Sequence, residues 1–267
     1  MQYVRPLHDL GILRQDRPTS FEATIYDPVL ILILHGRKET VLGGQSFPMT
    51  AGQCLLVSHD LPVVARVTKT PYLALIFQID LATLRELYEK MAEALPPNEE
   101  SRSLTVNRCG DEVVDALQRC LSLVGTPMDE AVLGPLVSRE IHYRLATAPF
   151  AGMLRDLIRH DSHASSIARA IAGLRRDFRA PLQIPVLARS VGMSASSFYK
   201  HFKTITASSP LQYRKSLQLL EARRLLRTGA FSVTGAAFDV GYESPAQFSR
   251  DYARKFGASP KHDLPSG

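Results

Sequence analysis

The sequence predicts an α+β protein of two domains: a β-barrel with attached helices, then an all-α domain with two helix-turn-helix motifs joined by a long helix. Three observations predict this. Short apolar runs separated by turn residues fill residues 22–79, apolar residues recur at helical spacing from Leu81 onward, and one pattern occurs twice, at 192–210 and 241–260. A chain of 267 residues is long enough to bury two separate cores.

The first half of the chain contains short runs rich in β-branched and aromatic residues. Gly, Pro and polar turn residues separate these runs, at the spacing typical of a small all-β barrel or sandwich. The runs are YDPVLILILHG, ETVLGG, QSFPM, QCLLVS, PVVARVT and PYLALIFQI. We therefore expect a β-barrel over about 20–80.

Helical periodicity replaces the strand pattern over about 81–148. The helical segments are LATLRELYEKMAEAL, DEVVDALQRCLSLV and MDEAVLGPLVSREIHYRLATA. In the second segment, one face carries Val113, Leu117, Leu121 and Val124. This face fits two arrangements equally well: a seam between two copies of the chain, or packing on the protein's own barrel.

The net charge changes sign along the chain. Residues 149–162 are the expected linker between a first domain, 1–162, and a second domain, 163–267. The second domain holds 16 Lys and Arg against 6 Asp and Glu, a net charge of +10, whereas the first holds 16 against 20, a net charge of −4. A basic domain of this size is typical of proteins that bind nucleic acid, although a solvated basic face has the same composition.

The composition argues against several other classes of protein. The longest apolar run, Val29 to Leu34, is far shorter than the ~20 residues that cross a bilayer, and residues 1–10 do not resemble a secretory signal. We therefore expect a cytoplasmic protein that binds no membrane. Three cysteines form neither a disulfide framework nor a paired zinc site, and no Gly-rich phosphate loop or catalytic triad pattern occurs. No cofactor, metal or catalysis is expected.

Each copy of the repeated pattern begins with a helix that ends in a small residue, two further residues, valine and glycine. Ala188 and Ala237 are small enough for two helices to cross closely. Gly192 and Gly241 tolerate the positive φ that ends a helix and turns the chain. The two helix-turn-helix units are expected at about 184–206 and 232–256.

The second helix of each unit has an N-terminal cap and a polar outer face. Ser194 and Ser244 are good N-caps, and Gln247 completes a capping-box pattern with Ser244. Aromatic residues fall on one side of a helical wheel, which leaves small and basic residues on the other. The outward residues are Ser196, Tyr199, Lys200 and Lys203 in the first unit, and Ala246, Ser249, Arg250 and Ala253 in the second, flanked by Gln247 and Arg254. Such a face fits the major groove of DNA, because small residues permit a close approach and a long cation reaches a base or a phosphate.

A long helix is expected between the two units. Ser209, Pro210 and Gln212 form another capping pattern, and the helix then runs to Thr228, before Gly229. Residues 210–228 span roughly 28 Å at ~1.5 Å each, which approaches the ~34 Å between successive major-groove faces. Both reading helices could therefore lie on the same side of a duplex.

These motifs resemble a known family. Residues 166–260 resemble the DNA-binding domain of AraC/XylS-type transcriptional regulators, and VGYESPAQFSRDYARKFGASP is similar to the family signature. Upstream, YDPVLILILHGRKETVLGG, GQCLLVSHDLPVVARV and PYLALIFQID resemble the cupin-like, AraC-type N-terminal domain found in one branch of the family. The resemblance covers nearly the whole chain and implies a bacterial transcription factor without enzyme activity.

The resemblance also implies base-reading residues and partners. The family's base-reading positions fall on Ser196, Ser197, Tyr199, Lys200, Ala246, Gln247 and Arg250. Lys203 and Arg254 extend the same two helices, and phosphate contact suits Arg254. The implied partners are a double-stranded DNA operator, a small-molecule effector of unknown identity in the N-terminal domain, a second copy of the chain in a homodimer, and RNA polymerase if the protein activates transcription.

Three other interpretations of the sequence stay open. A cupin-type metalloenzyme with an attached helical domain needs a facial set of metal ligands, but His35, Glu39 and His59 include no His-x-His pair. Helix-turn-helix units also serve contacts between proteins alone. In a thiol- or aldehyde-responsive regulator, Cys109 would be the sensor, because it lies just before the helix that begins at Asp111, and a helix N-terminus lowers a thiol pKa.

Overall fold

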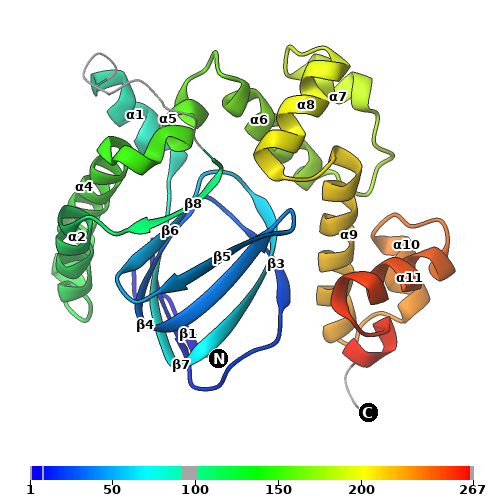
Figure 1. Ribbon diagram of the computed structural model, residues 1–267, viewed down its shortest axis with the longest axis horizontal. Coiled ribbons are helices and arrows are strands. Elements are labelled where there is room, and N and C mark those ends of the chain that lie inside the picture. Colours follow the sequence, from blue (N-terminus) through cyan, green and yellow to red (C-terminus); the bar gives the residue numbers. More distant parts are fainter. Residues whose placement is uncertain (1, 8, 92–101, 265–267) are drawn as a thin grey trace.

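The computed structural model describes residues 2–7, 9–91 and 102–264, and Figure 1 shows their arrangement. A β-barrel lies at the centre of the molecule. The helices that follow it in sequence pack along one side, and the C-terminal helices extend over its top and down its other side. The α+β architecture predicted from the sequence is thus confirmed.

The strands form one antiparallel sheet that curls into the barrel. They are β1 (Gln2–Val4), β2 (Leu10–Gln15), β3 (Glu22–Tyr26), β4 (Val29–Leu42), β5 (Gln45–Thr50), β6 (Gln53–Val57), β7 (Leu61–Gln78) and β8 (Leu104–Arg108). The order is β1-β2-β7-β4-β6-β8, with β3 paired to β7 and β5 paired to β4. The sheet starts earlier than the expected start at about residue 20, because β2 pairs with β7, and it continues past residue 80 through β8.

The alternation of side chains along β4 builds two apolar cores. Val29, Ile31 and Ile33 belong to the core inside the barrel, whereas Leu30 and Leu32 belong to an outer core shared with helices. Because both faces of this strand are buried, its sequence is a continuous apolar run instead of an alternating one.

Helices on the outer side of the sheet contribute to the outer core, apart from Pro127–Val132, which buries no residue. They are α1 (Leu81–Met91), α2 (Asp111–Ser122), α3 (Pro127–Val132), α4 (Gly134–Thr147) and α5 (Gly152–Ile158), with a 3-10 turn at Pro149–Ala151. The helix predicted over 128–148 is divided in two, and Pro135 lies in the first turn of α4, where its missing N–H costs nothing. Residues 92–95, which the sequence places in the first helix, lie outside the described residues.

The burial of side chains bears on two predictions for this region, the apolar face of α2 and the linker at 149–162. Val113 and Leu117 of α2 are 4% and 1% exposed in the outer core, so this part of the face packs on the protein's own barrel, whereas Val124 lies beyond the end of α2 and is 41% exposed. The expected linker, 149–162, contains α5, whose Leu154 and Leu157 are each 1% exposed in the same core. Its apolar residues make this segment part of the first core instead of a free connection.

The C-terminal half has two small cores joined by one helix. Its helices are α6 (His163–Arg176), α7 (Ile184–Ser190), α8 (Ala195–Thr206), α9 (Pro210–Arg227), α10 (Val233–Asp239) and α11 (Pro245–Phe256), with a 3-10 turn at Pro260–Asp263. Tyr213 and Leu217 of α9 pack in the core of the first unit, and Leu225 and Leu226 pack in that of the second. Helix α9 therefore fixes the two units relative to each other. Within the described chain, no helix has both the length and the apolar character needed to cross a membrane.

Ala188 of α7 and Ala237 of α10 lie at the two predicted helix crossings, and each is 0% exposed. Replacing either with leucine is expected to overpack its core and to lower the free energy of unfolding of the helical half by about 1–3 kcal/mol. Ala230, which is exposed, provides the matched control. Thermal unfolding of the three variants measures the difference, and a loss in Ala230→Leu as large as in the other two would show that the crossings are misplaced.

Candidate nucleic-acid interface

The first helix-turn-helix unit exposes a polar face on α8. The chain turns at Gly192, whose φ is +73°, and the Ser194 hydroxyl caps α8 by accepting a hydrogen bond from the Ser197 N–H at 3.2 Å. Phe198 and Phe202 are fully buried beneath the helix. The exposed residues are Ser196, Lys200, Lys203 and Tyr199, which is 47% exposed, while Ser197 is half-buried.

The second unit repeats this geometry on α11. Gly241 has a φ of +85°, and the Ser244 hydroxyl accepts a hydrogen bond from the Gln247 N–H at 3.3 Å. Phe248 and Tyr252 are fully buried. The exposed residues are Ala246, Gln247, Arg250 and Arg254, whereas Ser249 and Ala253, expected to point outward, are half-buried.

The capping box predicted at Ser244 is only half formed. The side chain of Gln247 makes no hydrogen bond to any residue that the structure describes. At Ser209 both halves are present, because the Gln212 N–H donates to Ser209 Oγ at 3.2 Å and the Ser209 N–H donates to Gln212 Oε1 at 3.0 Å. The amide of Gln247 is therefore free for a contact outside the protein.

The exposed cations of the two reading helices differ in their partners. Across the described ranges, the side chains of Lys200, Lys203 and Arg250 form no hydrogen bond or ion pair. Arg254 pairs with Asp251, which also binds Lys215 of α9 at 3.0 Å. Each unit thus presents unpaired positive charge next to a capped helix N-terminus.

Cations on α9 are paired within the protein. Arg223 and Arg227 bind the Asp263 carboxylate at 3.1 and 3.0 Å, and Arg224 binds Glu221 at 2.8 Å. The Tyr252 hydroxyl donates a further hydrogen bond to Asp263 at 2.6 Å, which ties the chain end to α11. In contrast to these arginines of α9, the side chains of Lys200, Lys203 and Arg250 have no ion pair within the described residues.

Two arginines, Arg179 and Arg214, hold the turn of the second unit against the segment that follows α6. Arg179 donates to the Asp239 carbonyl oxygen at 2.9 Å and to its carboxylate at 3.0 Å. Arg214 donates to the carbonyl oxygens of Phe178 and Arg179 at 2.8 and 3.1 Å. This arginine clasp was not predicted, because its partners lie far apart in the sequence.

The barrel contacts the first unit through an ion-pair cluster. Arg175 of α6 binds Asp27 at 2.5 Å and Asp60 at 2.8 Å, both at strand ends of the barrel. The Tyr213 hydroxyl of α9 donates to the Asp60 carbonyl oxygen at 2.9 Å. Two helices of the C-terminal half are thereby held to the same loop of the barrel.

His59 lies beside this cluster, fully enclosed between the two halves of the chain. Its Nε2 is 3.2 Å from the Ala164 carbonyl oxygen and its Nδ1 is 2.8 Å from the Ser58 hydroxyl. A carbonyl oxygen only accepts, so Nε2 carries the proton and Nδ1 accepts from Ser58 in the neutral ring. Burial lowers the pKa of His59 to about 4, despite the opposing effect of the Ala164 carbonyl.

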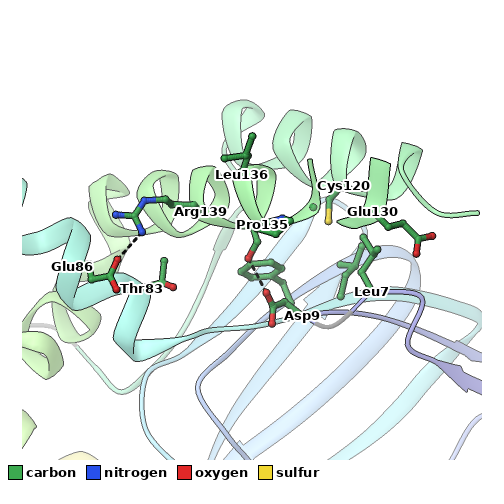
Figure 2. Close-up of a pocket in the computed structure, with 13 residues that line it drawn as sticks. Leu7, Asp9, Thr83, Glu86, Cys120, Glu130, Pro135, Leu136 and Arg139 are labelled. Atoms are coloured by element: carbon green, nitrogen blue, oxygen red, sulfur yellow. Dashed lines mark hydrogen bonds and ion pairs between the residues drawn. The ribbon is translucent and has the colours of Figure 1, made fainter. Parts of the chain in front are cut away.

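Two of the cavities in the described part of the N-terminal half border the sheet and are candidate ligand sites. One, of about 440 Å³, opens into the barrel interior and is lined by β2, β3, β4 and β7. The other, of about 580 Å³, lies between the sheet and helices α1 and α4, as Figure 2 shows. In the second cavity Ser138 donates to Asp9 at 2.8 Å and Arg139 binds Glu86 at 2.9 Å. Because these polar groups already bind each other, the barrel cavity is the better candidate for a ligand site.

The residues considered for metal chemistry lie apart. His35 is exposed, with Nδ1 2.6 Å from the Pro71 carbonyl oxygen, Glu39 binds Arg66 at 2.7 Å, and His59 is at the domain contact. In the part of the chain that the structure describes, no group of three or more His, Cys, Asp and Glu side chains is placed to hold a metal ion.

Cys109 lies between β8 and α2, and it is 4% exposed. Its thiol interacts with that of Cys54 in β6, which pairs with β8. This interaction lowers the pKa of Cys109 and raises that of Cys54, which burial raises further. The sequence pointed to Cys109 but not to Cys54, because the two thiols come together only through the pairing of β6 with β8.

Comparisons with known protein families agree with this architecture. Residues 6–153 match the model of the AraC-type transcriptional regulator N-terminus, and residues 187–264 match a helix-turn-helix domain model. The chain is 29% identical over 135 residues to the HTH-type transcriptional regulator CdhR of Pseudomonas aeruginosa, which covers 51% of this chain and 38% of that protein. It is 23% identical over 239 residues to the HTH-type transcriptional activator RhaS of Escherichia coli, which covers 87% of this chain and 83% of that protein.

A solved structure shares the fold. An apo ToxT variant from Vibrio cholerae strain SCE256 matches with a TM-score of 0.63 over 95% of this chain and 96% of that chain, at 11% sequence identity. The first family model covers more than half of the chain, and the second covers both reading helices. The chain belongs to the family of AraC-type transcriptional regulators, in which a helix-turn-helix domain binds DNA.

Proposed function

We propose that the protein recognises a specific operator in double-stranded DNA by inserting α8 and α11 into successive major grooves. The observation that carries this proposal is a pair of capped helices whose exposed faces hold cations unpaired within the described chain. The 18 residues of α9 span roughly 27 Å at ~1.5 Å each, which approaches the ~34 Å between successive groove faces. The rigid connection through α9 supports simultaneous insertion.

The proposed roles follow position along each helix. Ser196 and Ala246 are short, so they permit close approach of the backbone to base edges. Capping residues Ser194 and Ser244 orient free N–H groups toward the DNA. The proposed base or thymine-methyl contacts are Ser197, Tyr199, Lys200, Gln247 and Arg250, and the proposed phosphate contacts are Lys203 and Arg254.

Replacing Arg250 with alanine is expected to cost about 1–3 kcal/mol of binding free energy on the operator and to relax preference at one base pair. The reason is that its unpaired guanidinium can bind guanine O6 and N7 together. Arg254→Ala is expected to weaken specific and random DNA alike and to lower the salt slope by about one unit, because phosphate contacts carry no sequence information. Binding to the operator and to its single-base variants at two salt concentrations measures both effects.

Arg224 is the matched control, since its side chain is 63% exposed but binds Glu221 on α9, away from the reading faces. Arg224→Ala is expected to leave DNA binding unchanged. If Arg250→Ala weakened every sequence equally, Arg250 would be a phosphate contact. If neither Arg250→Ala nor Arg254→Ala affected DNA binding, α11 would not contact DNA as proposed, and if the unaltered protein bound no duplex DNA, the helix-turn-helix units would serve protein contacts instead.

Control by a small-molecule effector in the barrel cavity is the second part of the proposal. Asp27 lines the cavity and binds Arg175 of α6, so one residue touches both the ligand space and the DNA-binding half. A ligand that moves β3 or the start of β4 would therefore change the position of α6 and, through the shared core, of α8. This linkage offers a physical route from effector to DNA.

The proposal also includes two protein partners, a second copy of the chain and RNA polymerase. Met128, Val132 and Leu136 expose 78%, 58% and 62% of their surface on α3 and α4, which supports a homodimer surface there. RNA polymerase is a further partner if the regulator activates transcription. No catalytic step is part of this function.

A thiol-responsive regulator is a second candidate, favoured by the lowered pKa of Cys109 beside Cys54. Both thiols are buried, so a reagent would first have to enter the outer core. The open barrel cavity needs no such step, and for this reason a non-covalent effector is the preferred proposal.

A further inference from the structure

The barrel interior contains a buried lysine. Strict alternation from the inward-facing Ile33 would point residue 38 outward, but register shifts between Ile33 and Lys38 change the phase of β4. Lys38 consequently faces inward and is 8% exposed. Its side chain lines the cavity of about 440 Å³.

The ammonium group of Lys38 has no anionic partner within the described ranges of the chain. Its recorded interaction is with the Tyr26 ring, whose centroid lies 5.2 Å from Nζ. Glu39, next to it in sequence, binds Arg66, and Asp27 binds Arg175. A buried charge without a partner is costly, and a cation–π contact offsets only part of that cost.

Other polar atoms around the cavity also lack partners. The Tyr26 hydroxyl and Gln15 Oε1 line it, and the hydroxyls of Thr40 and Tyr72 are buried nearby on β4 and β7. None of these four atoms has a hydrogen bond to a described residue. Of the two atoms that line the cavity, the Tyr26 hydroxyl can donate a hydrogen bond, and its ring lies beside the Lys38 ammonium group.

Besides Lys38, the charged residues that line the cavity are Asp27 and Arg66, which are paired with Arg175 and Glu39, and Glu22, which is exposed, and much of the remaining lining is apolar. Its walls include Leu13, Val29, Ile31, Val67 and Ile76. A volume of about 440 Å³ lies within the range of small-molecule sites, roughly 300–1,000 Å³. The walls thus suit a compact hydrocarbon or aromatic body, while the polar end suits a negative group.

Resting on the proposed effector role of the barrel, we propose that the effector is an organic acid with a compact apolar body, whose carboxylate binds Lys38. The carboxylate would accept hydrogen bonds from the ammonium group and from the Tyr26 hydroxyl, and Gln15 Oε1 would accept from a hydroxyl or N–H on the ligand where one is present. The charge of Lys38, which has no anionic partner among the described residues, would be neutralised on binding.

Calorimetry on the full-length protein tests this with defined probes: benzoate, 3-phenylpropanoate and hexanoate, each against its corresponding alcohol. We expect at least one acid to bind about tenfold or more tightly than its alcohol, because a charge-assisted hydrogen bond is lost in the alcohol. Lys38→Met should remove that preference and leave binding of the alcohol unchanged. Lys69→Met, an exposed lysine on β7, should behave as the unaltered protein.

A second measurement separates loss of the site from loss of folding. Lys38→Met should melt at the same or a higher temperature without ligand, because it removes a buried unpaired charge. The proposal is overturned if no acid binds, if acid and alcohol bind equally, or if Lys38→Met binds the acid as before. If the acid binds through Lys38 but DNA binding does not respond to it, the ligand site stands and the effector role fails.

Discussion

Replacing Gly241 with alanine is expected to disrupt the second helix-turn-helix unit, whereas replacing Gly192 is expected to cost much less. Both glycines have positive φ, +85° and +73°, so an alanine costs about 1–2 kcal/mol at either position. Their surroundings differ. A Cβ on Gly241 would lie 2.6 Å from the Arg179 carbonyl oxygen, but a Cβ on Gly192 would meet no atom within 4 Å.

The contact at Gly241 cannot be relieved by rotating a side chain, because the obstructing atom belongs to the backbone. That carbonyl oxygen also accepts a hydrogen bond from Arg214, so the whole arginine clasp would have to shift. We expect a loss of about 3 kcal/mol or more for Gly241→Ala, with loss of operator binding. Thermal unfolding and DNA binding of both full-length variants measure the effect, and equal losses would show that the turn does not pack on the clasp.

The helix-turn-helix units were predictable because their signals are local. Ser194 and Ser244 cap the helices that they precede, and Ala188 and Ala237 are fully buried at the expected crossings. Each signal acts within one turn of helix or between adjacent helices. Local propensity, capping and periodicity therefore all predict the same helices, and each of these signals occurs in both copies of the repeat.

Contacts between distant segments could not be predicted from the sequence. Nothing local shows that Arg179 binds Asp239, or that Asp263 binds Arg223 and Arg227, because a charge does not specify its partner. For a related reason, the sequence did not predict the short helix α5 within the expected linker, 149–162. Its apolar residues form one short helix, and only the outer core shows what they pack against.

The barrel shows why site residues are harder to predict than elements. Alternation along a strand predicts which face of the sheet a side chain lies on only while the strand pairing has no register shift. Register shifts in β4 between Ile33 and Lys38 place Lys38 on the inner face, opposite to the face that alternation predicts. A lysine in a strand is usually solvated, so the sequence offered no reason to select it. Burial together with the absence of a described partner is what distinguishes it.

The stability of the protein is expected to fall as the pH decreases from about 6.5 to about 4, and part of that fall should depend on His59. Its pKa in the folded protein is about 4, below the ordinary value near 6.5, because the ring is buried between the barrel and α6. Between these values the unfolded chain binds a proton that the folded protein does not bind. The free energy of unfolding therefore decreases with falling pH in this window and is unaffected by His59 above it.

The size of this effect follows from the difference in pKa. A lowering of about 2.5 units corresponds to roughly 3 kcal/mol when the pH has fallen through the folded value, and to about 2 kcal/mol by pH 5. His59→Gln should remove this component. Burial also lowers the pKa of His142, so this residue contributes to the pH dependence of the free energy of unfolding. The difference between His59→Gln and the unaltered protein isolates the contribution of His59.

Denaturant unfolding at several pH values between 4 and 8 measures this difference, with His160→Gln as the control because His160 is exposed. In His160→Gln, the free energy of unfolding should change with pH as steeply as in the unaltered protein. His59→Gln should be less stable than the unaltered protein at pH 7, where it lacks the packed ring, and should lose less stability on acidification. A slope identical in all three proteins would mean that His59 already meets solvent, and hence that the barrel and α6 do not enclose it.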